Sequence, residues 1–250
     1  TSTEFTAAAD SMQQQLSALG YPTTRQDIGV DGAVSHNVIA DRAGTGADRE
    51  VVLLTAHLDS VNQRGPGRPA PGADDNASGS AGVLAIARAL AGHAGVHDLR
   101  LILFGGEEQG LHGSTQYVRS LPPAERARIR AVINMDMIGV RNVPERRVLL
   151  EGAAVSADLI EALAGAAARY TGLAVDRSFS PANSDHVPFI EAGLPAVLTI
   201  EGSDSSNGNV HSERDTVDTI DWELALEIVR MNVACAAELL GVPAEGWTRS

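Results

Sequence analysis

The sequence predicts an α/β fold: a three-layer sandwich in which a mixed, mostly parallel sheet is flanked by helices. One observation is that short apolar, β-branched runs alternate with segments of helical periodicity along the chain. A second is that Val51–Ala56 is a continuous apolar and β-branched run, typical of a strand buried on both faces. A third is the lack of any repeat, low-complexity tract or shift in composition. We therefore expect a single domain over residues 1–250.

The predicted elements follow from periodicity and from the signals at their ends. Thr3–Leu19 has the amphipathic pattern of a helix, and the polar, turn-rich region after it contains short strand candidates such as His36–Ala40. Asp221 is a candidate N-cap of the last helix, and Gly241 and Pro243 are stop signals. The other predicted elements are strand Val51–Ala56, helix Ala77–Ala91, strand Leu99–Phe104, helix His112–Leu121, strands Ala131–Asp136 and Arg147–Leu150, helix Ser156–Tyr170, strand Ala196–Ile200 and helix Asp221–Leu240.

Composition excludes several classes of protein. With 44% hydrophobic and 20% charged residues, the chain can bury a full core, so disorder, collagen and coiled coil are excluded. Its apolar stretches are far shorter than the ~20 residues of a membrane span, and we expect no membrane insertion. The chain begins at Thr1 rather than Met, as it would if a leader had been removed by processing or by the choice of segment.

Net charge and residue usage limit the partners that the chain can bind and the types of catalysis that it can use. The net charge of −13 repels a phosphate backbone, so nucleic acid is not an expected partner. The sequence contains no lysine, which excludes Schiff-base and phosphate-loop lysines. Cys235 is the single cysteine and lies in an apolar helical pattern, so we expect it in the core.

Acidic residues and histidines follow the predicted strands. His57 and Asp59 come at the end of the first buried strand, and Asp74 and Asp75 open a helix after a Gly/Pro-rich loop. The other members of this set are Glu107, Glu108, Asp136 and His211. Because ligands of such sheets bind beyond the carboxyl ends of the strands, we expect these side chains to meet at one edge.

Each of these residues has an ordinary structural interpretation by itself. An Asp-Asp pair before a helix is usually an N-cap, and a Glu-Glu pair in a glycine-rich turn is usually solvated. Asp136, however, lies in the largely apolar run Val132–Ile138, where a carboxylate must be paired or bound to a metal. Together these positions bring about six carboxylates near one another, which repel without a cation.

The donor set indicates the metal. Imidazole and carboxylate without thiolate suit zinc, with cobalt or manganese as possible substitutes. The candidates outnumber the three protein ligands of a usual catalytic zinc, so two ions that share a carboxylate fit better than one.

These residues form motifs that resemble the co-catalytic zinc aminopeptidases of peptidase family M28. The motifs occur in family order over residues 51–216, and the family fold agrees with the sandwich predicted above. They are His57-Leu-Asp59, Pro71-Gly-Ala-Asp74-Asp75-Asn-Ala-Ser-Gly79, Gly106-Glu107-Glu108-Gln-Gly110-Leu-His-Gly-Ser114, Asn134-Met-Asp136-Met and His211-Ser-Glu-Arg-Asp215-Thr.

The resemblance implies a role for each motif residue. Asp74 would bridge two zinc ions, with His57 and Asp136 completing one site and Glu108 and His211 the other. Glu107 and Asp59 would be the catalytic pair.

Glu107 would be the general base for a water activated by both ions, and Asp59 would hydrogen-bond the imidazole of His57. The family pattern also implies a cis peptide bond at Asp74–Asp75. The implied substrates are peptides with a free N-terminus, cleaved after the first residue, and the implied location is secreted or extracytoplasmic.

Further positions have two interpretations. Met137, Asp185 and Val210 are candidate substrate-binding residues; core packing explains Met137 and Val210 equally, and an N-cap of a short helix explains Asp185 and the neighbouring His186. Asp215 either orients His211 or caps the next turn. For the histidines outside the motifs, a surface or structural role is expected; these are His36, His93, His97 and His112.

The chain departs from the family at Val210, where some relatives place a tyrosine that helps to hold the oxyanion. The interval between Asp136 and His211 continues as sheet and helices, which leaves no room for the inserted lid or dimerisation domain of related metallopeptidases. Two alternatives stay open: a glutaminyl-cyclase-like enzyme with a single zinc, and a non-catalytic binding module on the same fold. Neither the preferred first residue nor the oligomeric state follows from the sequence.

Overall fold

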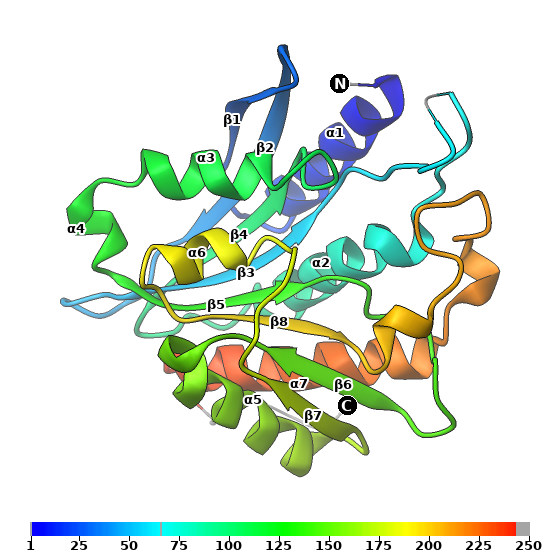
Figure 1. Ribbon diagram of the computed structural model, residues 1–250. Helices are drawn as coiled ribbons and strands as arrows, with labels where there is room; N and C mark the ends of the chain where they lie inside the picture. The colour runs from blue at the N-terminus through cyan, green and yellow to red at the C-terminus, as the bar shows by residue number, and fades with distance from the viewer. Residues whose placement is uncertain (1, 66, 244–250) are drawn as a thin grey trace.

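The molecule is built on one eight-stranded mixed sheet (Figure 1), seen in a computed structural model that describes residues 2–65 and 67–243. The strand order is β1-β2-β4-β3-β5-β8-β6-β7. The strands are β1 Thr23–Val30, β2 Ala33–Arg42, β3 Val51–His57, β4 Asp98–Phe104, β5 Ile129–Met135, β6 Arg147–Glu151, β7 Ala174–Ser178 and β8 Ala196–Glu201. The four central strands run parallel, whereas β6 is antiparallel to β8 and β2 is antiparallel to β4.

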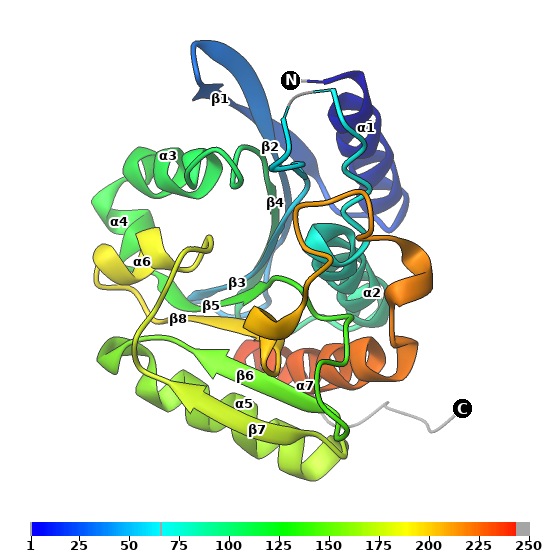
Figure 2. The ribbon, with the colours of Figure 1, turned by 45° about the vertical axis from the view of Figure 1, so that its right-hand side comes forward.

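Helices cover both faces of the sheet, which confirms the three-layer sandwich (Figure 2). One face carries α1, α2, α5 and α7, and the other carries α3 and α6. The helices are α1 Thr3–Ala18, α2 Gly79–Leu90, α3 His112–Ser120, α4 Pro123–Arg126, α5 Ala157–Tyr170, α6 Val187–Glu191 and α7 Trp222–Leu240, with short turns at Ala73–Ser78, Ala154–Ser156, Asp204–Ser206 and Val217–Thr219.

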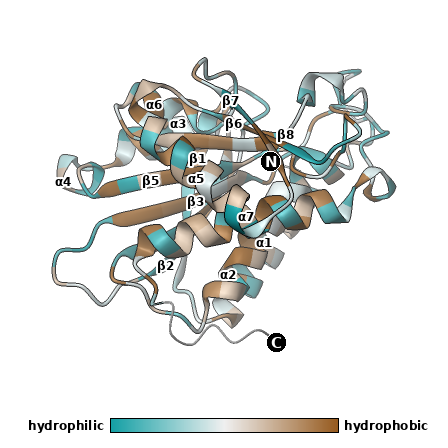
Figure 3. Cartoon of the chain, turned by 90° about the horizontal axis from the view of Figure 1, so that it is seen from below, coloured by the Kyte–Doolittle hydropathy of each residue, from teal (hydrophilic) through white to brown (hydrophobic). Residues whose placement is uncertain are grey.

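The hydrophobic core has one cluster on each face of the sheet. The larger cluster includes Leu54 and Ile133 from the central strands with Ile228 from α7, and the smaller one joins Leu53 of β3 to Phe189 of α6. Leu53 and Leu54 therefore point to opposite faces, as strand geometry requires. The central strands β3 and β5 are accordingly mainly hydrophobic (Figure 3). The few buried polar side chains of the central strands include Thr55, Asn134 and Thr199.

The structure differs from the predicted elements mainly at the edges of the sheet. The strand candidate His36–Ala40 lies within β2, whereas β1 was not predicted individually, because this edge strand is polar and buries few residues. The segment Ala174–Ser178 was predicted as no element and forms β7. Asp221 caps α7 as predicted, accepting from the backbone N–H groups of Glu223 and Leu224. Cys235 is buried in the larger cluster, also as predicted.

Within residues 2–65 and 67–243, no helix combines the length and the apolar character needed to cross a bilayer.

Candidate metal centre

The acidic and histidine motifs meet at the carboxyl ends of the parallel strands. His57 is the last residue of β3, and Asp136 directly follows β5. Glu107 and Glu108 lie in the loop after β4, and His211 comes from the loop that leaves β8. Chain segments that are distant in sequence thus deliver their polar groups to one edge of the sheet, as the motif positions predicted.

Two groups of ligand atoms form there, and each has three members. The first contains His57, Asp75 and Asp136; the second contains Asp75, Glu108 and His211. The Nε2 atom of His57 lies 3.2 Å from a carboxylate oxygen of Asp75 and 3.2 Å from one of Asp136. The Nε2 atom of His211 lies 3.0 Å from the other oxygen of Asp75 and 2.9 Å from Glu108. Asp75 is therefore the carboxylate common to both groups.

This geometry corrects the expectation that Asp74 is the shared carboxylate. The Asp74 side chain points away from both groups: Oδ1 accepts from the backbone N–H of Gly139 at 2.8 Å, and Oδ2 accepts from the Asn207 amide at 3.0 Å. The cis peptide bond likewise lies at Asp75–Asn76 and not at Asp74–Asp75. Adjacent residues of the same type offer the same chemistry, and the path of the backbone through this kinked turn decides which one faces the site.

Asp215 fixes that turn. Its two carboxylate oxygens accept from the backbone N–H groups of Asp74 and Asp75, at 2.9 and 3.0 Å. Asp215 thus stabilises the segment that carries the shared carboxylate, a role different from the two considered from sequence. Gly79, at the start of α2, allows this segment to approach β5, because a Cβ there would lie 2.3 Å from the carbonyl oxygen of Met135.

Asp59 contacts His57 through its backbone and not through its side chain. The Nδ1 atom of His57 lies 3.0 Å from the Asp59 carbonyl oxygen but 3.8 Å from its carboxylate. That carboxylate accepts from the backbone N–H groups of Glu107 and Glu108, at 3.2 and 3.1 Å. Because Nδ1–H donates to a backbone carbonyl, the neutral form of the ring would present its Nε2 lone pair to the site. The predicted hydrogen bond to the Asp59 carboxylate is therefore replaced by one to the Asp59 backbone carbonyl, and the Asp59 side chain positions the Glu107–Glu108 turn.

A buried chain of hydrogen bonds orients Asp136. Ser184 donates to Asp136 Oδ2 at 2.7 Å and accepts from the Asn134 amide at 2.9 Å. Asn134 in turn accepts from Thr55 at 2.7 Å. Ser184 was not among the predicted site residues, although it adjoins the candidate substrate-binding residue Asp185.

Gln63 is a second contact that sequence reasoning missed. Its side-chain amide lies 2.6 Å from Nδ1 of His211, so it fixes the ring whose Nε2 faces Asp75 and Glu108. The two residues are 148 positions apart, and Gln63 lies in a Gly/Pro-rich loop that carries no ligand motif.

Burial and mutual repulsion shift the pKa values of the site. Burial is the largest cause that raises the pKa of Glu107 to about 10, and the charges of Asp136, Asp185 and Glu108 add to it. Hydrogen bonds to Asp75 and Glu108 raise the pKa of His211 to about 10. Burial opposes the charged form of His57, but Asp136 and Asp75 nevertheless raise its pKa well above the usual value. The site therefore needs positive charge, and in the bare protein protons on the imidazoles supply it.

The residues present fit divalent metal ions. One oxygen of Glu108, Oε1, is buried without a hydrogen-bond partner among the described residues. Arginine is absent from the described residues that line the cavity, so no permanent cation balances its carboxylates. An imidazole with two carboxylates in each group is a donor set that suits zinc.

A cavity of about 530 Å³ opens directly onto these groups. Met137 and Val210 line it, as the substrate-binding interpretation requires. Asp185 does not line it and is fully buried. Met137 and His211 both adopt left-handed backbone conformations, with φ of 52° and 55°, which are uncommon for non-glycine residues.

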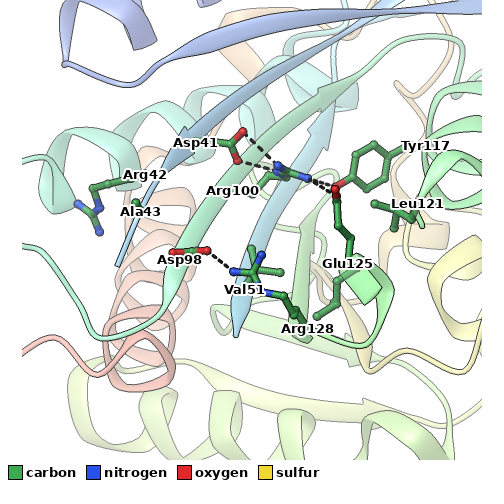
Figure 4. A pocket seen from close by; sticks show the side chains of 11 residues that line it. Asp41, Arg42, Ala43, Val51, Asp98, Arg100, Tyr117, Leu121, Glu125 and Arg128 are labelled. Atoms are coloured by element: carbon green, nitrogen blue, oxygen red, sulfur yellow. Dashed lines mark hydrogen bonds and ion pairs between the residues drawn. The ribbon is translucent and has the colours of Figure 1, made fainter. Parts of the chain in front are cut away.

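A second cavity, of about 200 Å³, lies at the opposite ends of the parallel strands (Figure 4). Its charged groups neutralise one another: Arg100 donates to both oxygens of Asp41, at 2.6 and 3.1 Å, and Arg128 pairs with Asp98. At the metal groups, by contrast, the ion pairs of the described residues are made by histidines and not by arginines.

The remaining histidines lie outside both groups, as expected from sequence. Within the described ranges, His36 pairs with Asp27 and His97 lies near Glu50, and neither is a member of a candidate metal group. The same is true of His93 and His112.

Fold and site together define a mixed α/β protein with a candidate metal centre at the carboxyl edge of its sheet. The family model for peptidase family M28 matches residues 37–236. Leupeptin-inactivating enzyme 1 of Streptomyces exfoliatus is 37% identical over 205 residues, which cover 80% of this chain and 43% of that protein. The chain belongs to peptidase family M28.

Solved structures show the same fold. A zinc aminopeptidase from Bacillus subtilis superimposes with a TM-score of 0.74 at 28% identity, over 87% of this chain and 53% of that one. Glutaminyl cyclase of Porphyromonas gingivalis has a TM-score of 0.73 at 23% identity, over 93% of this chain and 89% of that one. The chain spans about half the length of the curated relatives that it matches, with 43%, 55% and 57% of the first three covered.

Proposed function

We propose that this chain is a zinc-dependent aminopeptidase that binds two ions and hydrolyses the first peptide bond of its substrates. The observation that carries the proposal is the sharing of Asp75 between two three-membered ligand groups. His57 and Asp136 would hold one ion with Asp75, and Glu108 and His211 would hold the other. Membership of peptidase family M28 and the names of its aminopeptidase relatives support the same activity.

Zinc supplies Lewis acidity: it lowers the pKa of a bound water and polarises a carbonyl oxygen. Cobalt or manganese suits the same donor set.

Glu107 is the proposed general base. Its carboxylate lies 4.0 Å from Nε2 of His57, beside the first ligand group, and lines the cavity. It takes a proton from the attacking water and delivers a proton to the leaving amine. Burial and then the neighbouring carboxylates raise the pKa of Glu107, and two nearby divalent ions would lower it because their charge stabilises the carboxylate.

Other residues around the site orient the proposed base and the candidate metal ligands. The carboxylate of Asp59 fixes the backbone of Glu107 and Glu108, and Ser184 fixes Asp136. His211 would hold a metal through Nε2 with the proton on Nδ1, and the Gln63 side-chain amide, whose nitrogen lies 2.6 Å from Nδ1, would accept that proton through its oxygen once the amide has rotated by half a turn. Val210 takes the place of the tyrosine of some relatives, so the oxyanion would depend on the ions.

The proposed substrates are peptides with a free N-terminus, because the acidic wall of the cavity complements an α-ammonium group. The test is hydrolysis of leucine 4-nitroanilide and of an N-acetylated counterpart, with and without a chelator. We expect the free amine to be cleaved, the acetylated substrate to be inert, and the chelator to abolish the rate until zinc is restored.

Metal titration separates the proposal from its rivals. Full activity at two zinc ions per chain supports it, whereas cyclisation of N-terminal glutamine at one zinc per chain would identify a glutaminyl-cyclase-like enzyme. A chain that binds peptides without converting them would be a binding module. Export, which the family resemblance implies, stays a prediction that cell fractionation tests.

A further inference from the structure

One wall of the cavity at the metal groups is built by the strand pair β6 and β8. Leu149 and Glu151 are alternate residues of β6, and Leu198 and Ile200 are alternate residues of β8, so each pair faces the same side. The antiparallel register sets Glu151 opposite Leu198. A carboxylate is therefore placed in an otherwise aliphatic wall.

Glu151 is mostly buried, and no arginine pairs with it within residues 2–65 and 67–243. Its side chain is 13% exposed, and Oε1 accepts from the backbone N–H of Ala182 at 2.9 Å. Its ion-pair contact within the described residues is Nε2 of His186, at 3.7 Å. Burial lowers the pKa of His186 to about 4, so this imidazole is neutral at pH 7 and leaves the carboxylate unbalanced.

Asp204 is a second carboxylate of the same cavity, contributed by the turn after β8. No ion pair of the described chain involves it. Burial is the largest cause that raises the pKa of Glu151, and the charge of Asp204 adds to it. The two carboxylates thus act on one another.

The surrounding surface suits a flexible apolar stem. Met137 and Val210 complete the lining near the metal groups, next to the aliphatic side chains of β6 and β8. A long basic side chain buries its methylene groups along such a surface and places its charge at a polar end. In the cavity of Figure 4, by contrast, arginines of the chain itself already neutralise the carboxylates.

We propose that this cavity selects a first residue with a basic side chain, lysine or arginine, and that Glu151 and Asp204 determine this specificity. The inference rests on the proposed aminopeptidase function and adds the substrate class. A cation from the substrate would pair with a carboxylate that is already desolvated, so little further desolvation opposes binding.

The experiment compares substrates that differ in charge at nearly constant shape. The 4-nitroanilides of lysine and norleucine form one pair, and those of arginine and citrulline form the other. We expect kcat/KM to favour the charged member of each pair by roughly tenfold or more. Glu151→Gln should bring both ratios close to one, Asp204→Asn should lower them in part, and Glu161→Gln should leave them unchanged. Glu161 is the matched control, because it is an exposed glutamate on α5 paired with Arg177.

The readout is the ratio of kcat/KM for the charged substrate to that for the neutral one. A variant that only disturbs the fold lowers both values together and leaves this ratio unchanged. Calorimetric binding of free lysine and norleucine gives a second readout that needs no turnover, and lysine should bind more tightly to the wild type but not to Glu151→Gln. Cleavage with a charged-to-neutral ratio at or below one would overturn the specificity and leave the aminopeptidase function standing. Tighter lysine binding without any hydrolysis would overturn the aminopeptidase function and retain the cavity assignment. If the chain neither hydrolyses these substrates nor binds lysine more tightly than norleucine, both the aminopeptidase function and the cavity assignment are overturned.

Discussion

The carboxylate of Asp59 lies 3.2 Å from the backbone nitrogen of Glu107, and its second oxygen holds the next amide of the same turn. One side chain at the end of β3 thereby orients the proposed general base in the loop after β4. Asparagine has a single acceptor oxygen, so Asp59→Asn should lose one of these hydrogen bonds.

We expect Asp59→Asn to lower kcat by about 10–100-fold with smaller change in KM, because the turn that carries Glu107 loosens. Steady-state kinetics test this, with Asp27→Asn as the control, since Asp27 is exposed and pairs with His36. Unchanged kcat would show that the turn keeps its geometry without Asp59.

Glu107→Gln should retain the fold and bind two zinc ions, yet lose about 10²–10⁴-fold in turnover, because glutamine cannot take the proton. Circular dichroism, metal analysis and a nitroanilide assay measure these three properties. A variant with near-normal rates would rule Glu107 out as the base.

Ser184→Ala should weaken zinc binding about 10–100-fold, because Asp136 loses the donor that orients it. It also leaves the Asn134 amide without its acceptor, which should cost about 1–3 kcal/mol of unfolding free energy. Chelator competition and urea unfolding measure the two effects. Ser180→Ala is the control, since Ser180 is exposed; equal zinc affinity in both variants would contradict the role of Ser184.

The pH dependence of stability should change sign when zinc binds. In the metal-free protein the pKa of His211 is raised to about 10, above its usual 6.5, by Asp75 and Glu108. The stabilisation from this raised pKa is therefore complete below pH 6.5 and lost as the pH rises through about 10. Zinc binds the neutral imidazole, so its stabilisation should instead grow as the pH rises from about 6.

Urea unfolding of the wild type and of His211→Gln, each with chelator or with zinc and over a range of pH, tests this change in the pH dependence of stability. A difference between the two metal-free proteins that grows toward pH 10 would contradict the assigned shift.

Asp221→Ala should lower the unfolding free energy by about 0.5–2 kcal/mol without changing KM, because α7 loses its N-terminal cap while Asp221 is neither a candidate ligand nor a residue lining the cavity. Thermal unfolding measures the loss. A changed KM would indicate that α7 also positions the cavity.

The sequence by itself determined the sandwich, its central strands and the edge at which the acidic residues gather. An apolar run such as Val51–Ala56 is buried on both faces whichever strands it pairs with. Its local pattern was therefore enough to predict a central strand. The helix cap at Asp221 was predictable for the same reason, since its partners are two and three residues away.

Only the tertiary structure decided which of two adjacent residues faces the site and which distant residues orient the candidate ligands. The choice of Asp75 over Asp74 depends on the backbone direction of one kinked turn, which Asp215 sets from 140 residues away. Gln63 meets His211 and Ser184 meets Asp136 through loops whose sequences carry no periodic signal. The spacing within a motif predicts which types of side chain gather at a sheet edge. Which carboxylate faces the site depends on contacts between segments that only folding brings together.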